Sequence, residues 1–194
     1  MYQKLIKKIQ RKRIELLWDL EKNLFPFLYE RPMMRFVKEH CGGLLVGAEI
    51  GTRVGYNAYN IMNELNVGKL FLIDPYCSYE QGERSFDTSG EYEKAKRRLK
   101  KWWFKIVFVK KYSADAVEDV PYCLDFVYID GNHEYKYIKE DIELYWPKIK
   151  KGGVIGGHDF SGDDLDVVKA VMEFSNEHKL KLYTESTDWW FVKE

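Results

Sequence analysis

Two segments of this chain end an apolar run in residues that could do chemistry. In the first, FVYIDGNHEY, Asp130 follows four apolar or aromatic residues and His133 stands three positions later. In the second, GGVIGGHDF, the apolar run and two glycines lead into His158 and Asp159. Carboxylates and imidazoles bind metal ions and move protons in catalysis. The two segments therefore predict a metal site or an acid–base site, provided that the fold brings them together.

The elements that must position these residues alternate along the chain. Short apolar runs, most of them bounded by turn residues, predict strands at residues 44–50, 70–73, 106–109, 126–129 and 154–155. Helical patterns predict helices at residues 135–149 and along the stripe Val167, Val171 and Phe174. Strands that alternate with helices predict an α/β fold with a parallel sheet covered on both faces. The tail, KLKLYTES and WWFVK around a Thr-Asp turn, predicts a closing antiparallel pair.

In such a fold, ligands bind beyond the carboxyl ends of the strands, where the strand order reverses. If the strands before Asp130 and His158 are neighbours, both segments reach one crevice. For each segment alone the alternative is structural, an Asx turn at Asp130 or a satisfied pair at His158 and Asp159. The occurrence of both at neighbouring strand ends favours a functional site.

The first predicted strand leaves through VGAEIGTRVG, in which Gly47, Gly51 and Gly55 are four residues apart. A dinucleotide fingerprint would need closer glycines at a phosphate. Here Arg53 is too large for that pattern and Glu49 would repel a phosphate, which disfavours a nicotinamide oxidoreductase. A carboxylate beside a glycine turn suits a ligand with an amino group, but a tight strand-to-helix turn explains the glycines equally well.

The second predicted strand ends at Asp74 in LFLIDPY, 23 residues after Gly51. An acid at this place holds the ribose diol in nucleotide-binding sheets. A turn or cap role is the alternative for Asp74, and its position favours ribose binding. The following residues 76–90 are polar and long for a connection, which is typical of a functional or mobile loop beside the ligand.

The glycine turn with Glu49, the acid Asp74, the segment YSADAVED and the long segment LDFVYIDGNHEYKYIKEDIELYWPKIKKGGVIGGHDF together resemble a known family. They look like class I S-adenosylmethionine-dependent methyltransferases, in particular a small subgroup that includes sugar O-methyltransferases of antibiotic pathways. The resemblance covers roughly residues 44 to 193, and its most specific part is the D-G-x-H and GG-V-I-x-G-H-D pattern.

The resemblance implies a Rossmann-like fold with a seven-stranded, mostly parallel sheet whose last strand is antiparallel. It implies S-adenosylmethionine as cofactor, with Glu49, Gly51 and Gly55 near the methionine portion. By the same resemblance Asp74 holds the ribose hydroxyls and Ser113 lies by the adenine. Methyl transfer to an oxygen of a small molecule or glycan, with a sugar-like acceptor, is the expected activity.

Methyl transfer to a hydroxyl needs a place for the hydroxyl proton, and a divalent cation would lower the pKa of that hydroxyl. We expect Asp130, His158 and Asp159 to bind this metal and His133 to act as the base. Carboxylates suit Mg²⁺ or Mn²⁺, whereas an imidazole shifts the preference toward transition metals. Relatives carry an acidic or amide pair where this chain has His158 and Asp159. A metal-independent enzyme with His133 as base, or a non-catalytic cofactor-binding module, are the alternatives.

Composition sets the remaining expectations. With 31 basic and 31 acidic residues the net charge is zero, which gives no sign of a polyanionic partner. The aromatic and basic segment 93–105 could touch nucleic acid, but its charges favour a solvated helix face. Three separated cysteines and the lack of a signal-peptide core or membrane-spanning run indicate a cytoplasmic protein. Residues 1–40 are expected to form a helical cover or homodimer contact, and residues 41–194 the methyltransferase domain.

Overall fold

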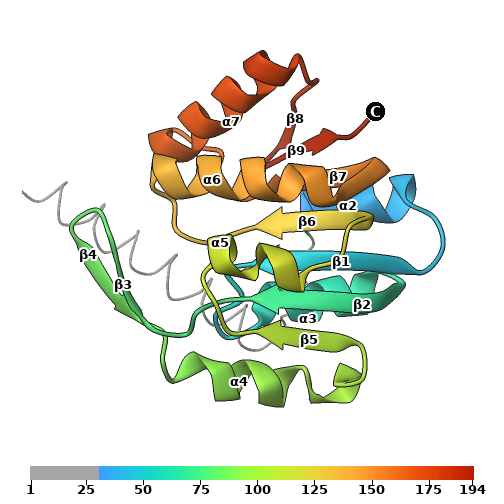
Figure 1. The fold of residues 1–194 in the computed structure, drawn as a ribbon, viewed down its shortest axis with the longest axis vertical. Helices are drawn as coiled ribbons and strands as arrows, with labels where there is room; N and C mark the ends of the chain where they lie inside the picture. Colours follow the sequence, from blue (N-terminus) through green and yellow to red (C-terminus); the bar gives the residue numbers. More distant parts are fainter. Residues whose placement is uncertain (1–30) are drawn as a thin grey trace, which may run out of the picture.

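The computed structural model describes residues 31–194 of the chain, in which helices cover both faces of a seven-stranded sheet (Figure 1). The strands are β1 (Leu45–Ile50), β2 (Val67–Ile73), β5 (Ile106–Val109), β6 (Leu124–Ile129), β7 (Ile149–Gly157), β8 (Tyr183–Glu185) and β9 (Asp188–Val192). Their order is β5-β2-β1-β6-β7-β9-β8. The pairs from β5 to β7 are parallel, and β9 is antiparallel to both neighbours. The predicted sheet is thereby confirmed.

The helices divide between the two faces of the sheet. They are α2 (Pro32–His40), α3 (Tyr56–Glu64), α4 (Glu91–Arg98), α5 (Ser113–Ala116), α6 (Tyr135–Tyr145) and α7 (Leu165–His178). Successive side chains of β6 point to opposite faces of the sheet. Val127 packs on the face that α6 and α7 cover, and Phe126 packs on the face that α2 and α3 cover, so both faces of the sheet are apolar. A strand buried on both sides is read from sequence as one continuous apolar run.

One predicted helix boundary is wrong, and three strands begin earlier than predicted, at Val67, Leu124 and Ile149. The helix expected at residues 135–149 ends at Tyr145, because Pro147 cannot supply a helical N–H and lies in a short 3₁₀ turn, Trp146–Lys148. Ile149 therefore opens β7, which is longer than the predicted strand at residues 154–155. The helix with the stripe Val167, Val171 and Phe174 is α7, and the closing antiparallel pair is β8 and β9, as predicted.

The segment between β2 and α4 is more ordered than the sequence indicated. It contains an antiparallel hairpin, β3 (Ser78–Gln81) and β4 (Arg84–Asp87), that projects from the main body (Figure 1). The carboxyl ends of β1, β2, β5 and β6 point toward the same side as the hairpin. The hairpin therefore stands at the edge of the sheet where a ligand is expected.

The strand order reverses between β1 and β6, which lie side by side although 73 residues lie between Ile50 and Leu124. The crevice expected for an α/β fold therefore starts there. The Asp130 N–H donates to the Ile50 carbonyl at 2.8 Å. Gly51 has φ of +85°, and a Cβ there would lie 2.0 Å from the Asp130 carbonyl oxygen. Only glycine fits this crossing, so the Gly51 turn fixes the distance between the first strand and the Asp130 segment.

Within residues 31–194 no helix has the length and apolar character that a membrane crossing requires. The helix α2 lies inside the predicted N-terminal helical segment 1–40. Residues 1–30, with the basic start that motivated that prediction, lie outside the described residues. The boundary at residue 40 and the dimer contact therefore stay predictions.

Candidate active site

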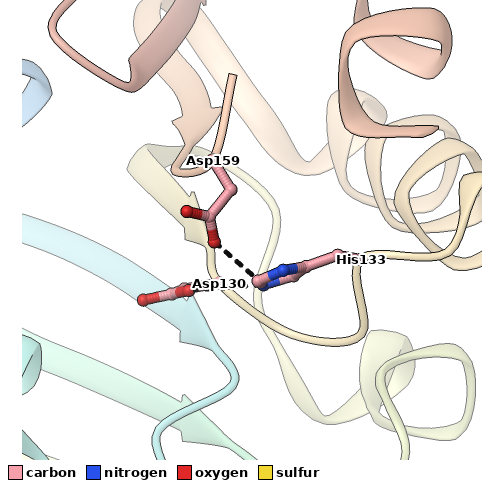
Figure 2. A group of neighbouring side chains, drawn as sticks. All are labelled: Asp130, His133 and Asp159. Atoms are coloured by element: carbon pink, nitrogen blue, oxygen red, sulfur yellow. Dashed lines mark ion pairs between the residues drawn. The ribbon is translucent and has the colours of Figure 1, made fainter. Parts of the chain in front are cut away.

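Three of the predicted residues meet at the carboxyl edge of the sheet (Figure 2). Asp130 follows β6, His133 stands in the loop before α6, and Asp159 follows β7. The His133 Nε2 atom lies 3.2 Å from Asp159 Oδ2, the ion pair shown by the dashed line in Figure 2, and 3.7 Å from Asp130 Oδ1. One ligand atom from each residue lies within 4.8 Å of the others, so in residues 31–194 this group could hold a metal ion.

His158, the third predicted metal ligand, contacts the start of the last strand as well as Asp159. Its Nδ1 atom lies 2.9 Å from Asp188 Oδ1 and 3.0 Å from the Thr187 hydroxyl, while its Nε2 atom is 3.5 Å from Asp159 Oδ1. The three residues whose spacing suits a metal ion are therefore Asp130, His133 and Asp159, and His158 is not among them. Asp188 opens β9, and no motif in the sequence indicated that it would reach this site.

Neighbouring charges and burial shift the pKa values of Asp130, His133 and Asp159. Burial alone would raise the pKa of Asp130, but the hydrogen bond from His133 and the nearby Arg31 guanidinium hold that pKa below its usual value. Burial would lower the pKa of His133, and the carboxylates of Asp130, Asp159 and Asp164 outweigh it, so the pKa is raised. Burial raises the pKa of Asp159, against the pull of both histidines. The site therefore favours an imidazolium between ionised carboxylates, or a metal ion in its place.

Arg31 is the cation that the sequence analysis missed. Its guanidinium lies 3.6 Å from Asp130 Oδ2 and 3.6 Å from Asp188 Oδ1, and its side chain is buried. It comes from the segment just before α2, almost a hundred residues from Asp130. Because no sequence motif surrounds Arg31, the sequence does not indicate that it contacts Asp130 and Asp188.

The predicted cofactor side of the crevice contains buried polar atoms without partners. Glu49 Oε1 accepts a hydrogen bond from Asn57 at 2.9 Å, and the Thr52 hydroxyl faces Glu49 and helps to lower its pKa. Within residues 31–194, Glu49 Oε2 and the Tyr76 hydroxyl have no partner in good hydrogen-bond geometry. Burial raises the pKa of Glu49 to about 8. Buried polar groups normally find partners, so this cluster fits a polar ligand, and an amino group fits Glu49. The sequence analysis did not predict Thr52 and Tyr76 as residues of this site. Their positions next to Gly51 and close to Asp74 in the sequence could have indicated them.

Asp74 holds the loop after β1 in place. Its carboxylate accepts the Arg53 N–H and the Tyr76 N–H, each at 2.8 Å, and burial raises its pKa. Arg53 and Tyr76 both have positive φ, so these bonds stabilise two backbone conformations that side chains disfavour. Each carboxylate oxygen has a second lone pair that could accept a ribose hydroxyl.

Ser113 and Gly55 occupy different surroundings. Ser113 begins α5 shortly after β5, and its carbonyl accepts the Tyr145 hydroxyl at 2.9 Å, which places it against α6 beside the Asp141 carboxylate, and its contact with the adenine stays a prediction. Gly55 starts α3 with φ of +76° and packs on Ala95 and Leu99. The structure thus gives Gly55 a packing role, and its contact with a cofactor stays a prediction.

The hairpin closes one side of the crevice through the loop that contains His133. The Asn132 side-chain amide donates to the Glu80 carbonyl at 2.9 Å, and the Gly82 N–H donates to Glu134 at 2.9 Å. Tyr79 stacks on Phe86 across the hairpin, with ring centroids 5.1 Å apart. Residues 132 and 134 flank His133, so hydrogen bonds join the hairpin to the loop that contains His133. The alternation of aromatic and polar residues around Gly82 was a signal for this hairpin.

Comparisons with known proteins agree with this arrangement. The model of a family described as "Methyltransferase domain" matches residues 48–160. Uncharacterized protein R132 of Acanthamoeba polyphaga mimivirus is 28% identical over 124 residues, which are 60% of this chain and 52% of the relative. The chain thus spans about half the length of that curated relative.

Solved structures share the fold at low sequence identity. A Streptococcus mutans protein assigned as a methyltransferase and solved with SAH has a TM-score of 0.63 at 13% identity, over 86% of this chain and 99% of that one. The O-methyltransferase NovP has a TM-score of 0.62 at 14% identity, over 83% and 79% of the two chains. At these identities the likeness concerns the fold.

Proposed function

This chain belongs to the class I S-adenosylmethionine-dependent methyltransferases, because the family match covers more than half of it, and we propose that its acceptor is a hydroxyl oxygen of a small, sugar-like molecule. We further propose that a divalent metal assists the transfer. The observation that carries the proposal is the Asp130, His133 and Asp159 group beside the buried cofactor side of the crevice. NovP, an O-methyltransferase with the same fold, supports an oxygen acceptor.

The cofactor would lie across the ends of β1, β2 and β5. When bound, it supplies a methyl group on a positively charged sulfur that an oxygen can attack. The unpartnered Glu49 carboxylate oxygen suits its amino group, and Asp74 suits its ribose hydroxyls. Ser113, at the start of α5, would lie at the adenine end. These residues bind and orient, which makes the attack effectively unimolecular.

The acceptor hydroxyl would lie at the three-residue group. Asp130 and Asp159 would hold the metal, which when bound lowers the pKa of the acceptor hydroxyl. The distances favour His133 as the third ligand, with His158 oriented by Asp188 as the remaining imidazole. In the arrangement predicted from the sequence, His158 is the ligand and His133 takes the proton.

One observation favours a metal-independent variant of the same reaction. The Arg31 guanidinium lies 3.6 Å from Asp130 Oδ2, so a fixed cation already stands beside a proposed metal ligand. In that variant His133 alone takes the acceptor proton while Asp130 and Asp159 orient its ring. Its raised pKa would then make turnover rise with pH as the imidazolium loses its proton.

Metal dependence is tested on an acceptor found in a panel of glycosides and phenols. We expect exhaustive chelation to abolish turnover and Mg²⁺ or Mn²⁺ to restore it, while the affinity for S-adenosylhomocysteine stays unchanged. Full turnover in metal-free enzyme would exclude the cation and leave the His133-only mechanism.

His133→Asn and His158→Asn separate the two ligand sets. The variant that loses Mn²⁺ binding, measured by electron paramagnetic resonance, identifies the ligand. If the other histidine is the base, its variant keeps Mn²⁺ and loses roughly 10²–10⁴-fold in turnover. His40→Asn, on the exposed end of α2, is the control and should change neither quantity.

A further inference from the structure

The edge of the sheet opposite the candidate active site exposes large apolar side chains. Leu44 precedes β1 and is 66% exposed, Trp103 and Phe104 precede β5 at 76% and 58%, and Tyr122 precedes β6 at 64%. Because these strands are parallel, their starts lie at one edge, and the candidate site lies at the other. Single exposed apolar residues are ordinary, but four along one edge indicate a surface that binds something.

Contacts between the strand starts join these side chains into one surface. The Leu44 side chain covers Gly68 in β2, where a Cβ would lie 2.7 Å from Leu44 Cγ. Lys105, next to Phe104, donates to the Val67 carbonyl at 2.8 Å. From β5 to β6 the sheet crosses three strand spacings, or about 14 Å. Trp103, Phe104, Leu44 and Tyr122 therefore follow one another along a single edge.

The same edge is basic, although the whole chain is electrically balanced. From Lys94 to Lys105, just before β5, the sequence has seven Lys and Arg residues and no Asp or Glu. Lys100 and Lys101 are exposed just before Trp102 and Trp103. Two acids near the strand starts are paired with lysines, Glu64 with Lys38 and Glu118 with Lys148. The lysines before β5 therefore leave a local positive charge beside the exposed apolar groups.

We propose that this basic apolar edge (Leu44, Trp103, Phe104 and Tyr122 with Lys100, Lys101 and Lys105) binds the surface of an anionic lipid bilayer. Aromatic and aliphatic side chains enter the boundary between headgroups and acyl chains, and lysines beside them attract anionic headgroups. Single-stranded nucleic acid would bind the lysines and stack on the aromatic rings, but such binding does not explain why Leu44 is exposed on the same edge.

Bound in this way, the protein would hold its active site away from the lipid. The six residues of β6 separate the two edges by about 20 Å, so the crevice opens toward the solution. The acceptor would then reach the site from the aqueous side. This inference concerns a separate surface and stands whether or not the proposed acceptor is correct.

The test is sedimentation of the full-length protein with vesicles of phosphatidylcholine mixed with phosphatidylglycerol, and with phosphatidylcholine alone. We expect binding to the mixed vesicles, weakened by added salt. The double variant Trp103→Ala/Phe104→Ala should bind the mixed vesicles at least about tenfold more weakly, since it removes two rings from the lipid boundary. Lys100→Gln/Lys101→Gln should weaken binding and reduce its dependence on salt.

The matched control is Leu165→Ala, because Leu165 is 67% exposed but begins α7 at the active-site edge. This variant should bind vesicles as the unmodified protein does. The Trp103→Ala/Phe104→Ala variant and the Leu165→Ala control should both keep the increase in melting temperature that S-adenosylhomocysteine causes. Failure of the unmodified protein to sediment with the mixed vesicles would overturn the proposal. So would equal loss in the control, or binding to single-stranded RNA that depends on Trp103 and Phe104 without binding to vesicles.

Discussion

At the scale of single residues, Glu49 shows most directly that a ligand belongs in this crevice. Its side chain is buried at the end of β1, where Oε1 accepts the Asn57 amide and Oε2 has no well-aligned hydrogen bond within residues 31–194. Burial raises its pKa to about 8, so the ligand-free protein holds it mostly neutral at pH 7. An unpaired buried polar group costs about 1–3 kcal/mol, which a cationic amino group would recover on binding.

Glu49→Gln should weaken S-adenosylhomocysteine binding by roughly 10–100-fold, because it removes a charge-assisted hydrogen bond. In the unmodified protein the bound amino group favours ionised Glu49, so binding at pH 7 should release close to one proton. Affinity should therefore rise with pH up to about 8. Calorimetry in buffers of different ionisation enthalpy measures both effects.

The control for this prediction is Glu93→Gln, an exposed change on α4. Proton release that persists in the Glu49→Gln variant would assign the proton to another group and contradict this role.

At the scale of elements, two hydrogen bonds join the hairpin to the loop that contains His133. The Asn132 amide binds Glu80 in β3 and the Glu134 carboxylate binds Gly82 at the turn, and His133 lies between Asn132 and Glu134 in sequence. Tyr79 and Phe86 stack within the hairpin, and the charges of Arg53 and Asp130 act on the Tyr79 hydroxyl. An acceptor that enters beside the hairpin would therefore meet an aromatic surface and the His133 loop together.

Removing both bonds with Asn132→Ala and Glu134→Ala should loosen the hairpin and leave the sheet intact. Two hydrogen bonds contribute on the order of 2 kcal/mol, so the open population should rise by about tenfold or more. Trypsin cleavage after Arg84, in β4, should accelerate accordingly, and turnover should fall while cofactor affinity changes little. Glu83→Gln at the same turn is the control, and equal acceleration there would show that the two bonds do not hold the hairpin.

At the scale of the whole molecule, two buried carboxyls make folding depend on pH. Burial raises the pKa of Glu49 to about 8 and that of Asp141, on the buried face of α6, to about 7. Both groups bind protons more tightly in the folded chain than in the unfolded one. Stability should therefore be greatest near pH 4 with respect to these groups and fall as the pH rises through 7 and 8.

Asp141→Asn should reduce the loss of stability that occurs as the pH rises. It removes a carboxyl that must ionise in a buried place, so the variant should gain stability above pH 7, by up to about 4 kcal/mol, and little near pH 4. Urea unfolding at a series of pH values measures the difference, with Glu143→Gln on the exposed face of α6 as control. A variant that is less stable than the unmodified protein at pH 8 would show that the Asp141 carboxylate is satisfied in the fold.

The sequence by itself determined the architecture and the edge where the chemistry lies. Apolar runs and helical stripes are local patterns, so they were enough to predict the parallel sheet, α7 and the closing pair of β8 and β9. Asp130 and Asp159 directly follow strands, and the carboxyl ends of parallel strands share one edge, so their convergence could be predicted as well. The end of α6 was missed because Pro147 stands inside an otherwise unbroken apolar pattern.

Only the tertiary structure decided which side chains stand together within that edge. It placed His133 with the two carboxylates and turned His158 toward Asp188, a residue of the last strand. It also brought Arg31 to Asp130 from the other end of the described chain. Sequence periodicity reports which face of an element is buried, whereas such contacts depend on strand order, on loop conformation and on side-chain direction. Those are set by packing between segments far apart in the chain, and no local pattern records them.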